Sequence, residues 1–226
     1  MGVKRSPFFM RIFLDTAETE LIRKAFATGL IDGLTTNPTL IRKSGRDPEE
    51  VYQEIKEIGV PDVSMEVVGT GEEMVAEGRR LKEKFGDIAT IKVPCTRGGL
   101  AACRVLAKEG IRVNVTLIFD AAQAILAAKA GAAYVSPFVG RLDDNSINGL
   151  DTIKDISAIF QTQWIKTEFL SASIRGVKAG SESFALGAQI VTMPPSVFDK
   201  MYNHVLTDKG LELFDKDWAE VSTTTK

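Results

Sequence analysis

A lysine inside an apolar segment is the residue of this chain with the clearest chemical potential. Lys92 lies in IATIKVPC at 88–95, a segment otherwise apolar enough to form a buried strand. A buried ammonium group costs several kcal/mol unless it is paired or loses its proton. A desolvated amine can also serve as a nucleophile that forms a Schiff base with a carbonyl substrate. A lysine at the strand end that reaches solvent or a structural carboxylate explains this segment equally well.

Two carboxylates in other strand-like segments could work with such a lysine. Asp15 ends the segment RIFLD, and Glu66 lies in DVSMEVV. Condensing a carbonyl group on Lys92 and breaking a carbon–carbon bond both need proton transfers, which these carboxylates can supply. The only histidine, His204, lies outside this pattern. We therefore expect carboxylate rather than histidine acid–base chemistry, although Asp15 could also cap a following helix.

The remaining apolar segments also carry polar residues near their ends. These are Thr35, Thr36, Asn37, Asn114, Thr116, Ser136, Arg141, Ser171, Ser173 and Arg175. Each has a structural explanation: Asn37 can make a turn before a proline, Thr116 suits any strand, and Arg141 can pair with the adjacent aspartates. These explanations would have to coincide in strand after strand, so the sequence favours one shared polar pocket. Within it, Arg141, Ser173 and Arg175 suit an oxygen-rich anion such as phosphate.

These side chains can share a pocket if their segments are parallel strands around one barrel. Strand-like runs alternate with helical patterns that stop at glycine, without a linker between them. The strands are expected at 11–15, 33–37, 62–68, 88–94, 112–118, 133–139, 165–171 and 189–193. Eight such units predict an α/β fold, a single (β/α)8 TIM barrel at 10–205, whose active groups come from the carboxyl ends of the strands. A doubly wound open sheet is the alternative.

Both ends of the chain lie outside this repeat. Residues 1–9 are expected to be a loose extension. Residues 206–226 are expected to form an extra C-terminal helix and tail, because apolar residues recur there on one helical stripe. The stripe consists of Leu211, Phe214, Trp218 and Val221. We expect it to pack on the barrel or on a neighbouring subunit.

The composition argues against several classes of protein. A hydrophobic fraction of 44%, a charged fraction of 26% and a net charge of -2 give no basic surface for nucleic acid or an anionic membrane. No segment has the pattern of a transmembrane helix, and the first residues do not have that of a signal peptide. Cys95 and Cys103 lack metal-ligand spacing and are expected to be reduced thiols in a cytoplasmic protein. Without a metal cluster or a nucleotide-binding glycine motif, we expect no metal and no cofactor.

Six motifs together are typical of one family. They are IFLDTA at 12–17, LTTNPT at 34–39, IKVP at 91–94, NVTLIF at 114–119, YVSPFVGRLDD at 134–144 and SASIR at 171–175. Jointly they resemble the small transaldolases, the group that also includes the fructose-6-phosphate aldolases. The resemblance runs from residue 10 to about residue 220. It implies a metal-free Schiff-base mechanism in a (β/α)8 barrel, with sugar phosphates as substrates.

The resemblance also implies a role for each matched position. Lys92 matches the Schiff-base lysine, and Asp15 matches the carboxylate that moves the proton of the hydroxyl next to the cleaved bond. Glu66 and Thr116 match a pair that holds a catalytic water. The positions expected to contact substrate are Thr36, Asn37, Asn114, Ser136 and Phe138, with Arg141, Ser173 and Arg175 at its phosphate.

Two positions favour the transaldolase branch of this family. Glu66 stands where the fructose-6-phosphate aldolases usually carry glutamine, and Phe138 where they usually carry tyrosine. The expected reaction, in the pentose phosphate pathway, moves a dihydroxyacetone unit from sedoheptulose 7-phosphate to glyceraldehyde 3-phosphate. An aldolase that releases free dihydroxyacetone is the nearest alternative. A non-catalytic sugar-phosphate-binding barrel is the alternative from another class.

One segment departs from the family pattern. GVKAGSESFALG at 176–187 is richer in small and polar residues than the matching helix usually is, so the sequence leaves the edge of the phosphate site open. The family is also similar in forming rings of five that stack into decamers, with the last helix packed on a neighbour. The resemblance therefore implies a homo-oligomer, a pentamer or a decamer.

Overall fold

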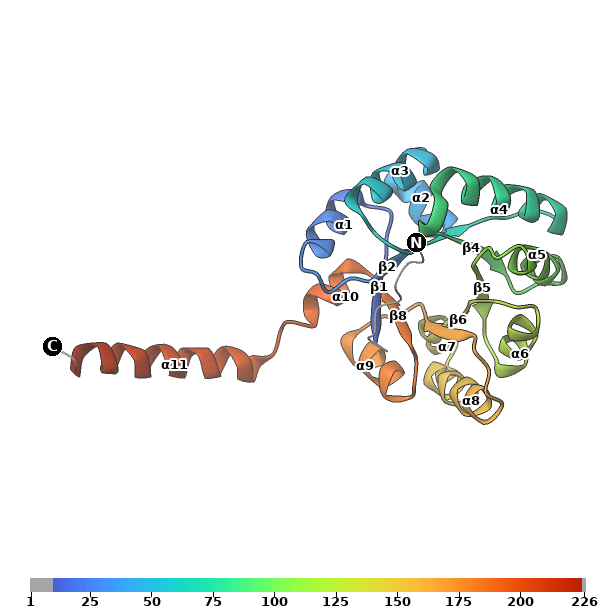
Figure 1. Ribbon diagram of the computed structural model, residues 1–226. Coiled ribbons are helices and arrows are strands. Elements are labelled where there is room, and N and C mark those ends of the chain that lie inside the picture. Colours follow the sequence, from blue (N-terminus) through green and yellow to red (C-terminus); the bar gives the residue numbers. More distant parts are fainter. Residues whose placement is uncertain (1–9, 225–226) are drawn as a thin grey trace.

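The computed structural model describes residues 10–224 and shows a closed barrel of eight parallel strands in chain order (Figure 1). The strands are β1 Arg11–Asp15, β2 Gly33–Thr35, β3 Val63–Glu66, β4 Ala89–Pro94, β5 Val113–Ile118, β6 Tyr134–Pro137, β7 Glu168–Ser171 and β8 Ile190–Met193. β1 pairs with both β2 and β8, which closes the barrel. The predicted (β/α)8 barrel is confirmed, and the open-sheet alternative is wrong.

Helices surround this barrel, and a further one follows it (Figure 1). They are α1 Thr19–Phe26, α2 Pro38–Ser44, α3 Pro48–Ile58, α4 Gly71–Phe85, α5 Arg97–Lys108, α6 Ala121–Lys129, α7 Val139–Asp143, α8 Gly149–Thr162, α9 Val177–Ala185, α10 Pro195–Lys200 and α11 Val205–Thr224. A 3-10 turn, Gly86–Ile88, leads into β4. None of the helices within residues 10–224 is long and apolar enough to cross a membrane.

Seven of the eight strands are shorter than the sequence predicts, and in β2 and β7 the reason is local. β2 ends at Thr35 because Asn37 caps the next helix: its Oδ1 accepts the Leu40 amide at 3.0 Å. β7 begins at Glu168 because the turn that ends α8 extends to Ile165. Trp164 has a φ of 54° there, and the Ile165 amide donates to the Phe160 carbonyl at 2.9 Å.

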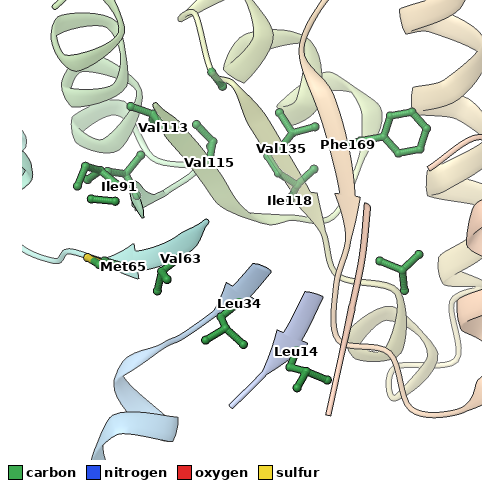
Figure 2. Packing of buried hydrophobic residues seen from close by; sticks show 14 of the residues in the cluster. Leu14, Leu34, Val63, Met65, Ile91, Val113, Val115, Ile118, Val135 and Phe169 are labelled. Carbon is green, nitrogen blue, oxygen red and sulfur yellow. The ribbon is translucent and has the colours of Figure 1, made fainter. Parts of the chain in front are cut away.

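The main core lies between the strands and the surrounding helices. Figure 2 shows ten labelled members that point outward from the barrel, among them Leu14, Leu34, Val63 and Ile91. A second cluster includes Phe13, Tyr134, Leu170 and Ile190. Because alternate strand residues face opposite sides, these two clusters account for the apolar positions on both faces of the sheet. The polar interior positions at the carboxyl ends of the strands are therefore left to form a site.

The last helix does not lie on the barrel. α11 extends away from it in Figure 1. The four residues of the predicted stripe, Leu211, Phe214, Trp218 and Val221, are exposed by 56%, 61%, 69% and 54%. Packing of this stripe on its own barrel, the first of the two expectations, is thus not observed. The loose extension expected at 1–9 lies outside the described residues, as do residues 225 and 226.

Candidate active site

A cavity of about 390 Å³ opens at the carboxyl ends of the barrel strands. Ten of the predicted site residues line it: Asp15, Asn37, Glu66, Lys92, Thr116, Ser136, Phe138, Arg141, Ser173 and Arg175. They come from strands, or from the segments just after them, all around the barrel. This is the position at which barrels of this kind carry their active groups. Two further predicted residues, Thr36 and Asn114, are close by but are not part of its lining.

Lys92 is held in the wall of this cavity by two oxygens. Its residue is 4% exposed, and its Nζ lies 3.0 Å from Glu66 Oε2 and donates to the Thr36 carbonyl at 2.9 Å. β3 and β4 are in register at Glu66 and Lys92, so the two side chains leave the sheet at the same level. The ammonium group is therefore paired and hydrogen-bonded, which is what its burial requires. The amine also borders the space in which a carbonyl compound would lie.

Asp15 lies on the same cavity, supported by hydroxyl groups. Thr35 Oγ1 donates to Asp15 Oδ1 at 2.7 Å, and Thr35 Oγ1 lies 2.7 Å from Thr192 Oγ1. Burial raises the pKa of Asp15, and the Thr35 hydrogen bond and the positive charge of Lys92 oppose that rise. A carboxyl group with a raised pKa is suited to taking up and returning a proton near neutral pH.

Thr116 contributes an unoccupied hydrogen-bonding group to the cavity wall. Its Oγ1 is buried and has no hydrogen-bond partner within residues 10–224. The pairing of β5 with β6 shifts register between Val115 and Ile118, and Leu117 has a φ of 58° in this interval. Such irregularities re-aim side chains beside functional sites. The Thr116 hydroxyl is accordingly available to a water molecule or a ligand in the cavity.

Thr36 and Asn114 act on the site through other residues. Thr36 Oγ1 donates to the Ser64 carbonyl at 2.9 Å and lies 3.0 Å from the Tyr52 hydroxyl, while its own carbonyl holds Lys92. Asn114 is fully buried. Its amide donates to Ser64 Oγ at 3.1 Å and accepts from Ser136 Oγ at 2.6 Å. In this arrangement Ser136 lies on the cavity wall, and Asn114 fixes its orientation.

An aromatic and cationic group forms another part of the wall. The guanidinium carbon of Arg141 lies 5.7 Å from the centre of the Phe138 ring. The Phe138 ring meets the Phe119 ring edge-on, with centroids 5.9 Å apart. Asp144, one of the two aspartates that follow Arg141 in the sequence, pairs with Arg175 and not with Arg141. Its Oδ2 lies 2.6 Å from Arg175 Nη2. Two guanidinium groups are thus brought to the same cavity, as an anionic ligand requires.

The segment that carries Ser173 and Arg175 approaches α7 very closely. The Gly140 amide donates to the Ser173 carbonyl at 3.1 Å, and Ser173 has a φ of 60°. A Cβ at Gly140 would collide with that carbonyl. The small residues of 176–187 then form α9, in which the buried Ser183 hydroxyl lies 2.8 Å from Ser171 Oγ. The small residues of this segment fit its packing on the barrel, where Gly180 lies next to Met193 and Val191 of β8.

Three residues around this site, Thr35, Thr192 and Phe119, are difficult to predict from the sequence alone. Thr35 was visible as one polar residue among several, but its bond to Asp15 depends on the pairing of β1 and β2. Thr192 and Phe119 resemble ordinary strand and core residues. The alternation of IVTM would have put Thr192 on the same face as Ile190, the barrel interior, which is the one available clue.

The fold and the cavity define a class: an α/β-barrel enzyme with a lysine, two carboxylates and two arginines at the carboxyl ends of its strands. Comparison with known proteins narrows this class. Residues 12–225 match the family model described as Transaldolase/Fructose-6-phosphate aldolase, and the chain belongs to this family. It is accordingly an enzyme of the transaldolase or aldolase type.

Relatives with similar lengths support the assignment. A "Probable transaldolase" of Caulobacter vibrioides (strain NA1000 / CB15N) is 52% identical over 211 residues, covering 93% of this chain and 97% of the relative. A "Probable transaldolase" of Lactiplantibacillus plantarum (strain ATCC BAA-793 / NCIMB 8826 / WCFS1) is 48% identical over 218 residues, covering 96% and 100%. These names are those of the relatives and not of the present chain.

A solved structure with a similar fold is a flavocytochrome b2 variant with sulfite bound. It has a TM-score of 0.60 and 13% sequence identity, and the match covers 84% of this chain and 57% of that chain. At this identity the likeness concerns the barrel fold alone.

Proposed function

We propose that the protein is a transaldolase that moves a dihydroxyacetone unit from sedoheptulose 7-phosphate to glyceraldehyde 3-phosphate. The products are erythrose 4-phosphate and fructose 6-phosphate, and the reaction belongs to the pentose phosphate pathway. The observation that carries the proposal is the approach of Lys92 Nζ to Glu66 Oε2, 3.0 Å, in a cavity that Asp15 and Thr116 also line. These four groups are what Schiff-base chemistry on a ketose needs: a nucleophilic amine and groups that move protons.

The first step is condensation of Lys92 with the ketose carbonyl. The amine adds to the carbonyl carbon, and the oxygen leaves as water, which forms a protonated Schiff base. Glu66 pairs with the amine, and the Thr116 hydroxyl has a free hydrogen-bonding position. We assign to these two the water through which protons reach the departing oxygen.

The second step breaks a carbon–carbon bond. Asp15 takes the proton of the hydroxyl on the β carbon, two carbons from the carbon that bears the Schiff-base nitrogen. The bond between the α and β carbons then breaks, its electrons move into the Schiff base to form an enamine, and the β carbon leaves as an aldehyde. The enamine then attacks the acceptor aldehyde, and Asp15 returns its proton to the new hydroxyl group. Water finally releases the product ketose from Lys92. The raised pKa of Asp15 supports this alternating role.

Arg141 and Arg175 are assigned to the substrate phosphate. Both line the cavity, and Arg175 exchanges its pairing with Asp144 for the phosphate in this proposal. Ser173, which lies between the two arginines in the sequence, also lines the cavity and adds a hydroxyl group. A guanidinium group offers two parallel hydrogen bonds to such an anion.

Borohydride reduction in the presence of fructose 6-phosphate tests the Schiff base. Peptide mapping should find the reduced three-carbon adduct on Lys92, and Lys92→Arg should abolish both the adduct and turnover, because arginine keeps the charge but cannot form the Schiff base. An adduct on another lysine, or no adduct, refutes the assignment. If neither the wild-type protein nor Lys92→Arg turns over the sugar but both bind sugar phosphates equally well, a non-catalytic sugar-phosphate-binding barrel is favoured.

The aldolase that releases free dihydroxyacetone is the second candidate, because the matched family contains both activities. Glu66 and Phe138 favour transfer over release, by their resemblance to the transaldolase branch. Turnover of fructose 6-phosphate with and without erythrose 4-phosphate separates the two. Cleavage that is equally fast without the acceptor would favour the aldolase.

We also propose that the chain forms a homo-oligomer, a pentamer or a decamer, in the cytoplasm. The exposed apolar residues of α11 support association: Leu211 is 56% and Phe214 61% exposed on a helix that extends from the barrel (Figure 1). Cys95 and Cys103 are free thiols, as a reducing compartment favours.

A further inference from the structure

Two threonine hydroxyls form a chain that ends on the Asp15 carboxylate. Thr35 Oγ1 donates to Asp15 Oδ1 at 2.7 Å and lies 2.7 Å from Thr192 Oγ1. A hydroxyl group has one hydrogen to donate. Because Thr35 gives its hydrogen to Asp15, Thr192 must be the donor to Thr35. The chain therefore runs from Thr192 through Thr35 to the carboxylate.

Closure of the barrel brings these residues together. Thr35 lies on β2 and Thr192 on β8, the two strands that flank β1 and Asp15. The two threonines are 157 residues apart in sequence, and each is 2% exposed. Thr192 also lines the cavity, as Asp15 and Thr35 do. Its hydroxyl thus lies between the buried chain and the space for the substrate.

Packing alone does not call for a hydroxyl at this position. Valine has nearly the shape of threonine and would fill the same space without a polar atom to desolvate. Thr90 shows that this barrel uses a buried threonine elsewhere to satisfy a buried carboxylate, since its hydroxyl donates to Asp62 Oδ1 at 2.7 Å. At Asp15 that task already belongs to Thr35, so Thr192 is an additional hydroxyl.

A chain of hydroxyl groups can support a carboxyl group in both of its protonation states. When Asp15 is ionised, the chain donates hydrogen bonds toward it. When Asp15 is protonated, the direction reverses: Asp15 donates to Thr35, Thr35 donates to Thr192, and Thr192 turns its hydrogen toward the cavity. A cationic partner would favour the ionised form alone. This reversible support fits a group that takes up a proton in one step and returns it in the next.

We propose that Thr192 is a positioning residue for Asp15, which acts through Thr35 to keep the carboxyl group oriented in both protonation states. The inference rests on the proposed function, in which Asp15 moves the proton of the hydroxyl beside the cleaved bond. It adds a residue from the eighth strand, β8, whose hydroxyl is linked to Asp15 through the hydroxyl of Thr35. Loss of this hydroxyl should affect bond cleavage and spare Schiff-base formation, because Lys92 is held by Glu66 and the Thr36 carbonyl.

The test compares Thr192→Val with Thr192→Ser in the full chain. Thr192→Val keeps the shape and removes the hydroxyl, and we expect kcat for transfer to fall about tenfold, with little change in KM. The acidic limb of the kcat–pH profile should move to higher pH, because hydrogen bonds to the ionised carboxylate are charge-assisted and stronger, so the loss of Thr192 weakens the support of the ionised form more than that of the protonated form. Thr192→Ser keeps the hydroxyl and should restore both kcat and the profile.

Thr90→Val is the matched control, because it removes a buried hydroxyl of the same kind outside the cavity lining. It should lower the melting temperature and leave the acidic limb in its wild-type position. The proposal is overturned if Thr192→Val has a wild-type kcat and pH profile, if its kcat falls without a change in the profile, or if Thr192→Ser is equally impaired.

Borohydride trapping separates this proposal from the proposed function. Wild-type protein and Thr192→Val should both give the adduct on Lys92 with fructose 6-phosphate. If wild-type protein gives no adduct, the proposed function is refuted on its own. If wild-type protein gives the adduct and transfers the three-carbon unit while Thr192→Val matches it, only the role of Thr192 is refuted.

Discussion

Lys92 Nζ lies 3.0 Å from Glu66 Oε2, and both side chains belong to neighbouring strands that are in register at these two residues. The pair is largely buried, with side-chain exposures of 5% for Lys92 and 13% for Glu66. A carboxylate so close to the amine balances its charge and can also exchange protons with it.

Glu66→Gln should impair proton transfer at the amine while leaving Lys92 in place. Glutamine keeps the shape but cannot take up a proton, so we expect kcat/KM to fall by about 10²–10⁴. The reduced adduct on Lys92 should still form, at a lower rate. Stopped-flow transfer assays and timed borohydride trapping measure the two effects. A variant with wild-type rates of adduct formation and transfer would show that Glu66 takes no part in proton transfer.

Asp15→Asn should change the pH dependence of stability. Burial raises the pKa of Asp15, so the folded protein binds this proton more tightly than the unfolded chain does. The corresponding stability is present below the pKa of the unfolded chain and is lost as the pH rises through the folded pKa. We therefore expect Asp15→Asn to be more stable than wild-type protein at neutral pH, with the difference shrinking at acidic pH.

Melting temperatures of the two proteins across the acidic to neutral range test this sign. Asp144→Asn, at an exposed carboxylate, serves as the control and should lack the same trend. A wild-type advantage that grows toward neutral pH would contradict the prediction. Asp15→Asn should also lose transfer activity, because an amide cannot take the hydroxyl proton.

Phe138→Tyr should shift the enzyme toward release of free dihydroxyacetone. The Phe138 ring lines the cavity beside Phe119 and Arg141, and a phenol there adds a hydrogen-bonding group that can hold water near the enamine. We expect acceptor-independent cleavage of fructose 6-phosphate to rise on the order of tenfold. A coupled assay for dihydroxyacetone measures it, with Phe119→Tyr as the control. An unchanged ratio of release to transfer would remove Phe138 from this role.

Gly140→Ala should disturb the segment assigned to phosphate binding. The added methyl group would meet the Ser173 carbonyl and lie 2.7 Å from Arg175 Cγ, so this segment must move. We expect a loss of about 1–3 kcal/mol in the free energy of unfolding and a higher KM for phosphorylated sugars. At Gly176 an added Cβ has no neighbour within 4 Å, so Gly176→Ala is the matched control. Equal effects of the two substitutions would argue against the close approach.

Charges on the apolar side of α11 should prevent association. Leu211→Asp combined with Phe214→Asp adds two negative charges to its exposed stripe. We expect a smaller particle in sedimentation velocity and an unchanged circular dichroism spectrum, because α11 does not lie on the barrel (Figure 1). Lys216→Asp makes the same change in net charge away from the stripe and should leave the assembly intact. Wild-type protein that sediments as a monomer would refute the oligomer itself.

The sequence was most informative where the free-energy cost of burying a residue can be judged from its neighbours in the chain. A charge within an apolar strand is costly in any tertiary arrangement, so Lys92 could be singled out before the fold was known. The alternation of strand and helix patterns likewise predicts the barrel, since each unit must bury an apolar face against the next. The apolar stripe of α11 follows from periodicity alone in the same way.

Other features depend on which strands become neighbours, and this only the tertiary structure decided. Thr35 and Thr192 are ordinary strand residues until closure of the barrel sets β8 and β2 on either side of β1. Asn114 has its amide bonded to Ser64 and Ser136, so it orients the cavity wall and does not line it. Periodicity could show that α11 has an apolar side, but not that the helix extends away from the barrel (Figure 1). The residue types and their neighbours in the chain determine which residues are costly to bury. Hydrogen-bond partners are determined only when closure of the barrel brings their atoms within about 3 Å of each other.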